Sequence, residues 1–123
     1  MSVLVDTHAL LWIVDGDQRV PAWLVQEASA PDIRISHVSL WEIAIKRSLG
    51  RLDVDDDLPV RLDALGVNWL QIRAEHAWGV GDLPHHHRDP FDRLLISQAL
   101  SEGLVIATAD PVFAEYGVPV RWS

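Results

Sequence analysis

The sequence contains no cysteine, and its one methionine is the first residue. Disulfides, thiolate metal ligands and cysteine nucleophiles are therefore excluded, and redox chemistry gives no clue to the compartment. Lysine is almost absent as well: Lys46 is the only lysine, and the other nine basic residues are arginines. Any mechanism that needs a lysine late in the chain is excluded with it.

Long apolar runs are also missing, since none approaches the roughly 20 residues that cross a bilayer. The first residues, MSVLVDTHALLWIVDGD, lack the basic region and the small-residue cleavage site of a signal peptide. Asp6 and His8 interrupt their apolar character. We therefore expect a soluble, cytoplasmic protein without a membrane partner, whose chain starts with a strand.

Acidic residues outnumber basic ones, and the formal net charge is −8. Affinity for nucleic-acid phosphates comes from clustered lysine and arginine, so this charge argues against such a ligand. Part of the acid lies in DVDDD (residues 53–57), which is typical of a solvated loop. A bound divalent cation would reverse the sign locally, so nucleic acid remains a candidate substrate.

Short apolar runs alternate with longer amphipathic ones along the 123 residues, a length that fits one domain, 1–123. We predict strands at residues 3–5, 33–36, 67–72, 104–110 and 118–122. We predict helices at residues 8–14, 21–28, 39–50, 58–66, 74–80 and 89–103. Strands separated by helices indicate a three-layer α/β/α domain around a mostly parallel sheet.

Acidic residues follow several of these strands. Asp6 ends the first strand and Asp110 ends the strand at 104–110, while Glu42 and Asp92 are placed in the first turns of their helices. Ligands of such sheets bind outside the carboxyl ends of the strands. We therefore expect four carboxylates, far apart in the sequence, to meet at one edge.

Helix capping offers a simpler explanation for each acid taken alone. Ser39 and Glu42 have the spacing of a capping box, and Asp89 has the same spacing to Asp92, with proline at the first helical position. Asp110, followed by proline, also fits an N-cap. Capping does not explain why the acids converge, and carboxylates about 4 Å apart repel by roughly 1 to 4 kcal/mol per pair.

A hard divalent cation would relieve that repulsion, because every candidate ligand is an oxygen. Mg²⁺ or Mn²⁺ suits a carboxylate cluster that keeps several waters on the ion. Such a site serves phosphoryl chemistry, in which the metal binds a phosphate oxygen and activates a water. The residues thus indicate a phosphodiesterase.

Four segments in the order VDTHALLW, SLWEIAIK, HHRDPFDRLLISQA and TAD carry a family resemblance. They resemble the PIN-domain ribonucleases, specifically the VapC-like toxins of bacterial type II toxin–antitoxin modules, and the likeness extends from Val3 to Trp122. The resemblance implies a five-stranded parallel sheet and a Mg²⁺- or Mn²⁺-dependent endoribonuclease. It maps the family's acidic quartet onto the four carboxylates Asp6, Glu42, Asp92 and Asp110.

The same resemblance implies partners and a reaction. Family members are neutralised by a cognate antitoxin protein, usually form homodimers and typically cleave tRNA or ribosomal RNA. A metal-held water attacks the phosphorus in line and leaves 5′-phosphate and 3′-hydroxyl ends. Asp6 would be the central metal ligand, Asp92 and Asp110 would complete the shell, and Glu42 would orient water or hold a second ion.

Six further residues are candidates for contacts to substrate or to the ligands. Thr7 and Thr108 flank metal acids and would hydrogen-bond them or form local turns. Lys46 would pair with Glu42 one turn away or reach a substrate phosphate. Arg88 and Arg93 border the site as RNA contacts or solvated side chains, and Asp89 is the helix cap.

Three consecutive histidines, His85, His86 and His87, precede the last helix. Imidazole is a poor match for Mg²⁺, so we expect them to shape the loop or to touch RNA rather than to bind the metal. The six tryptophans lie in apolar segments and are expected mostly in the core or in interfaces.

Two of four competing classes are excluded by the position of the single lysine, and two remain as alternatives. Haloacid dehalogenase-like hydrolases and response-regulator receivers also gather acids at this edge, but both need a late lysine. The hydrolases also need a second aspartate where this chain has His8. A non-catalytic acidic interaction module, or another Mg²⁺-dependent phosphohydrolase, would have the same acids in other roles.

Overall fold

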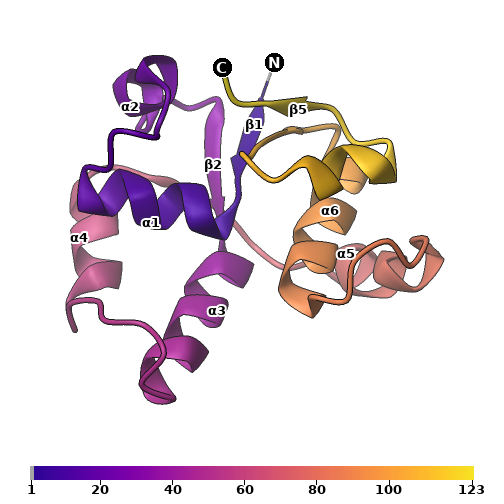
Figure 1. Cartoon of the computed structure of the whole chain (residues 1–123), viewed down its shortest axis with the longest axis horizontal. Helices are drawn as coiled ribbons and strands as arrows, with labels where there is room; N and C mark the ends of the chain where they lie inside the picture. Colours follow the sequence, from indigo (N-terminus) through magenta and orange to yellow (C-terminus); the bar gives the residue numbers. More distant parts are fainter. Residues whose placement is uncertain (1) are drawn as a thin grey trace.

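The computed structural model describes residues 2–123, which form one five-stranded sheet with helices on both sides (Figure 1). Neighbouring strands are all parallel, in the order β3-β2-β1-β4-β5. The strands are β1 (Val3–Val5), β2 (Ile33–Ser36), β3 (Asn68–Leu70), β4 (Val105–Ala107) and β5 (Val120–Arg121). The predicted three-layer α/β architecture is therefore confirmed, and the sheet is parallel throughout.

Each predicted helix is present, within about two residues of its expected bounds. The helices are α1 (Thr7–Asp15), α2 (Ala22–Glu27), α3 (His37–Ser48), α4 (Leu58–Ala64), α5 (Ala74–Gly79) and α6 (Pro90–Glu102). Two short 3-10 segments, η1 (Val80–Asp82) and η2 (Pro111–Tyr116), were not predicted. Within residues 2–123, none of the helices has the length and hydropathy to cross a membrane.

Side chains of the central strand β1 point alternately into two separate apolar cores, because successive residues of a strand face opposite sides of the sheet. Val3 and Val5 pack with α1, α2 and α4 on one face. Leu4 packs with α6 and η2 on the other. Figure 1 shows the two groups of helices to the left and right of the strands. The sheet thus lies between two apolar cores, one on each of its faces.

The start of α3 differs from the prediction. Strand β2 runs directly into the helix, and the hydroxyl of Ser36 caps it by accepting from the Val38 amide at 3.0 Å. The proposed capping box of Ser39 and Glu42 is therefore wrong, because both residues lie inside the helix. Glu42 is buried one turn further along than expected, which frees its carboxylate from a capping role.

The start of α6 agrees with the prediction. Asp89 caps it by accepting from the amides of Phe91 and Asp92, and Pro90 is the first helical residue. Gly103 ends the helix with a left-handed φ of 68°, a conformation that side chains with a Cβ rarely adopt. The Asp89 cap and Pro90 fix the start of α6, and with it the position of Asp92 in the first turn.

Candidate metal centre

The site lies at the carboxyl edge of the sheet, where β1 is flanked by β2 on one side and β4 on the other. Connections leave in opposite directions from this point, which is where open parallel sheets bind their ligands. The amide of Asp6 donates to the carbonyl of Ala107 at 3.1 Å, which joins the ends of β1 and β4. Residues that follow these strands are thereby held side by side.

Asp6 occupies the centre of this edge and is 3% exposed. One carboxylate oxygen accepts from the Ala9 amide at 2.8 Å, so Asp6 also caps α1. The other accepts from the hydroxyl of Thr108 at 2.5 Å. Burial raises the pKa of Asp6 in spite of these hydrogen bonds, and the negative charge of Asp110 adds to the effect.

Glu42 points toward the same edge from α3 and is 2% exposed. Its Oε2 accepts from the Lys46 ammonium at 2.5 Å, an ion pair between residues one helical turn apart. Its Oε1 is buried and has no hydrogen-bond partner among residues 2–123. A buried carboxylate oxygen without a partner costs about 1 to 3 kcal/mol or more, so this atom indicates a missing ligand.

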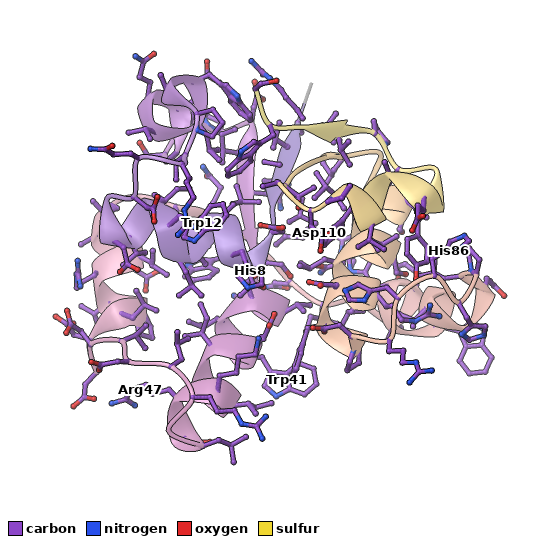
Figure 2. The ribbon with its side chains drawn as sticks, viewed as in Figure 1. His8, Trp12, Trp41, Arg47, His86 and Asp110 are labelled. Carbon is purple, nitrogen blue, oxygen red and sulfur yellow. The ribbon has the colours of Figure 1, made fainter. Side chains whose placement is uncertain are left out.

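Asp92 and Asp110 approach each other from α6 and η2, together with His87. One potential ligand atom from each of the three lies within 4.8 Å of the other two. The Nε2 atom of His87 is 2.8 Å from Oδ2 of Asp92. Asp110 caps η2 by accepting from the Val112 amide at 3.0 Å, as its sequence position predicted. Figure 2 shows Asp110 in the central region between the two groups of helices.

Burial and neighbouring negative charges both act on the pKa of Asp92. Burial raises its pKa to about 6, the hydrogen bond from His87 lowers it, and the charges of Asp89, Glu42 and Asp6 raise it again. Asp92 therefore experiences both carboxylates that come from β1 and α3. The four predicted acids lie at one edge, where the charge of Asp110 adds to the raised pKa of Asp6 and the charges of Glu42 and Asp6 add to that of Asp92.

A divalent cation fits this donor set. The oxygens are hard ligands, two of the acids are buried, and one oxygen has no partner within residues 2–123. Burial, with added charge repulsion, raises the pKa values of Asp6 and Asp92. Capping uses one oxygen each of Asp6 and Asp110 and leaves the rest of their lone pairs for other contacts. The caps and the metal site are thus compatible explanations of the same residues.

The remaining predicted residues divide between support and surface. The Thr108 hydroxyl donates to Asp6 and accepts from the Asp110 amide at 3.0 Å, so it links two of the acids. The Thr7 hydroxyl instead donates to Ser39 at 3.0 Å and joins α1 to α3. Arg88 is exposed, which suits a substrate contact.

Arg93 does not face the solvent. It is buried, and its guanidinium donates to the carbonyls of Pro84 at 2.7 Å and Val80 at 3.1 Å and to the Tyr116 hydroxyl at 3.2 Å. These contacts hold the loop ahead of α6 against η2. The structure therefore gives Arg93 a role in loop anchoring in place of an RNA contact.

Sequence reasoning missed the position of His87, which lies against Asp92. The available signal was its spacing five residues before Asp92 across the turn at Asp89 and Pro90. Four of the tryptophans agree with the expectation, since Trp12, Trp23, Trp69 and Trp122 pack partly buried against one of the cores. Trp41 and Trp78 are 52% and 86% exposed.

Comparisons with known proteins agree with this fold. A complex of VapB and VapC from Rickettsia felis bound to promoter DNA contains a chain with a TM-score of 0.75 at 17% identity, each chain covered over 100%. DNA-bound VapBC from Salmonella typhimurium gives 0.71 at 19% identity, covering 98% of this chain and 97% of that one. FitAcB from Neisseria gonorrhoeae gives 0.69 at 20% identity, covering 96% and 95%. No curated protein sequence matches at a significant level.

The family itself is given by the sequence match. The model of the PIN domain matches residues 3–119, nearly the whole chain, including all four acids at the sheet edge. The parallel sheet and the acidic edge agree with that match. The chain belongs to the PIN domain family.

Proposed function

We propose that the protein is a metal-dependent endoribonuclease and the toxin of a toxin–antitoxin module. The observation that carries the proposal is the buried Oε1 of Glu42, which finds no hydrogen-bond partner in the part of the chain that the structure describes and lies beside other negatively charged carboxylates. Membership of the PIN domain family supports a nuclease, and the similar folds belong to proteins described as toxin–antitoxin complexes. The alternative of a non-catalytic acidic module leaves that oxygen unexplained.

Asp6, Asp92 and Asp110 would hold Mg²⁺ or Mn²⁺, with Glu42 holding a water or a second ion. When bound, the ion supplies an activated water and neutralises charge on the phosphate oxygens. The protein's own part is to fix the carboxylates on strand ends and helix starts. Hydrolysis would leave 5′-phosphate and 3′-hydroxyl ends.

Lys46 and Arg88 are the cations placed to meet the substrate. The Lys46 side chain is 37% exposed and also experiences the charges of Asp89 and Asp92, so it lies beside the site. It would exchange Glu42 for a phosphate oxygen when RNA binds. We propose tRNA or ribosomal RNA as the substrate, whose cleavage arrests translation in the cytoplasm.

An apolar groove between α1, α2 and α4 offers a place for the cognate antitoxin. Its volume is about 270 Å³, and its lining includes Leu10, Ile13, Ile33 and Leu62. Exposed Val25 and Leu65 extend the apolar surface at its rim. We propose that an apolar segment of the antitoxin packs here. The substitution Leu65→Asp introduces a charge at the groove and should weaken binding in a pull-down of the pair.

A second copy of the chain is the proposed partner of the exposed apolar face of α3. Trp41 and Leu49 are 52% and 59% exposed there, and the Trp41 ring packs edge-on against Phe91 at 5.0 Å. Light scattering after size-exclusion chromatography should give a dimer that Leu49→Asp converts to a monomer. A monomeric wild type would remove this part of the proposal.

The test of function compares wild type with Asp6→Asn, induced in a bacterial host. Mapping new 5′ ends across total RNA should give discrete cuts with the wild type and none with Asp6→Asn. Equal growth of the two strains without wild-type-specific cuts would reject the ribonuclease toxin. Mn²⁺ titration of the purified proteins separates a metal site from an acidic interaction module, because only the former predicts binding that depends on Asp6.

A further inference from the structure

The loop between η1 and α6 ends in a hydrogen-bonded anchor. The His87 amide donates to the Tyr116 hydroxyl at 2.7 Å, and the guanidinium of Arg93 donates to the same oxygen at 3.2 Å. Tyr116 and Arg93 are both buried, so these contacts are shielded from water. The backbone of His87 is therefore held in place independently of its ring.

The ring of His87 is directed at one oxygen of Asp92. The distance of 2.8 Å from Nε2 to Oδ2 is that of a hydrogen bond, and an ionised carboxylate accepts only. The proton must then be on Nε2, which makes the imidazole the donor. This hydrogen bond fixes the orientation of the Asp92 carboxylate beside Asp110.

We propose that His87 is a positioning residue of the metal centre, which orients the Asp92 carboxylate for the ion. The inference rests on the proposed metal site but concerns metal affinity, which can be measured without RNA. Ligating carboxylates are commonly held by a second hydrogen bond, and loss of such a partner typically weakens metal binding about 10- to 100-fold. Here the loop anchor supplies that partner.

The two neighbouring histidines do not share this role. His86 is exposed, and its ring packs edge-on against Tyr116 at 5.1 Å between centroids. His85 is exposed at the outer part of the loop. A run of three identical side chains thus contains one that contacts the acids and one, His85, that serves as a matched control.

The experiment measures Mn²⁺ binding to the full chain by calorimetry for wild type, His87→Ala, His87→Gln and His85→Ala. We expect His87→Ala to weaken binding about 10- to 100-fold. His87→Gln places an amide donor near the position of Nε2 and should recover most of the loss. His85→Ala should bind as the wild type does.

Two results would overturn the inference. Unchanged affinity in His87→Ala means that the hydrogen bond does not orient the ligand. Equal losses in His87→Ala and His87→Gln, together with imidazole nitrogen coupling to Mn²⁺ in pulsed electron paramagnetic resonance of the wild type, mean that His87 is a metal ligand instead. Melting temperatures without metal check folding, which the backbone contacts to Tyr116 should preserve.

Failure of the function and failure of this inference are distinguishable. A wild type that cuts RNA, with metal affinity independent of His87, removes the inference alone. A wild type that cuts no RNA, but whose Mn²⁺ affinity depends on the donor at position 87, removes the ribonuclease alone. Wild type without any Mn²⁺ binding removes the metal-site proposal and the inference together.

Discussion

Helix α6 carries a histidine–carboxylate pair at each end, and the two pairs have opposite surroundings. At its start, His87 meets Asp92 at 2.8 Å, and at its end, His76 meets Glu102 at 2.9 Å. His76 is fully buried, and its Nδ1 accepts from the Arg73 amide at 3.0 Å. The hydrogen-bonding atoms of its ring are thus both used.

Further hydrogen bonds surround His76 at the C-terminal end of α6. The Ser97 hydroxyl donates to the His76 carbonyl at 2.6 Å, and Gln98 joins the Ser36 hydroxyl at 2.6 Å to the carbonyl of Gln71 at 3.2 Å. These bonds tie α5 and β2 to α6. A buried polar network with satisfied partners acts as structure, because it specifies one packing arrangement.

The start of α6 also has a histidine and carboxylates, but their hydrogen bonds are not complete. Acids accumulate there, the Oε1 of Glu42 has no partner, and the pKa of Asp92 rises to about 6. Repulsion between these carboxylates lowers the stability of the fold, and a bound cation would relieve it. Histidines and carboxylates therefore stabilise the fold where their hydrogen bonds are complete. Where these bonds are incomplete, the same residue types are available to bind a ligand.

The strongest test of this contrast is Asp92→Asn. It should reduce metal-dependent RNA cleavage on the order of 1,000-fold, because metal stabilisation of the transition state is worth several kcal/mol. The metal-free melting temperature should stay level or rise, since a repelled charge is removed. A large drop in melting temperature with full activity would reverse the roles assigned to the two ends.

His76→Ala should do the opposite. It removes a fully buried ring and leaves the Arg73 amide and Glu102 without their partner, at a cost of about 3 kcal/mol. Thermal unfolding should shift down by roughly 10 °C. Activity per folded molecule below that transition should match the wild type, and a catalytic defect would refute the separation.

The stability of the fold should also depend on pH and on Mn²⁺ through Asp92. The raised pKa of Asp92 means that the metal-free fold gains stability from this group below pH about 4, its unfolded value, and loses it as the pH rises through about 6. Mn²⁺ at 100 times its dissociation constant adds about 2.7 kcal/mol, or roughly 10 °C, at pH 7.5. Calorimetric scans should show a smaller gain at pH 5, where protons compete for Asp92.

Lys46→Met should give the smallest effect. The ammonium is the partner of the buried Glu42 in the absence of metal, so its removal should cost about 2 kcal/mol in denaturant unfolding without Mn²⁺. Saturating Mn²⁺ should reduce that cost, because the ion then neutralises the carboxylate. A cost that is independent of Mn²⁺ would place Lys46 among purely structural pairs.

Local signals in the sequence predicted much of the fold. Asp89, Pro90 and Gly103 define α6 through caps that depend only on neighbouring residues, and the structure has these caps. The acids that follow strands were placed at one edge because parallel strands end together. Both inferences use rules that operate within one element or one sheet.

Other features depend on contacts that no local rule contains. Ser36 caps α3 because β2 ends there, which shifted Glu42 deeper into the helix than the capping-box spacing indicated. Arg93 resembles a surface cation in the sequence, yet carbonyls of the loop at residues 80–84 surround it. His87 reaches Asp92 because Tyr116, from the far end of the chain, anchors its backbone.

The hydrogen bond from Thr108 to Asp6 spans 102 positions of the chain. Strand β1 is synthesised about a hundred residues before its neighbour β4, and the acid Asp110 follows β4. A growing chain on the ribosome therefore cannot assemble the acidic edge until residues 105–110 have been made. In the proposed ribonuclease, a nascent chain without β4 would lack the site that cleaves RNA.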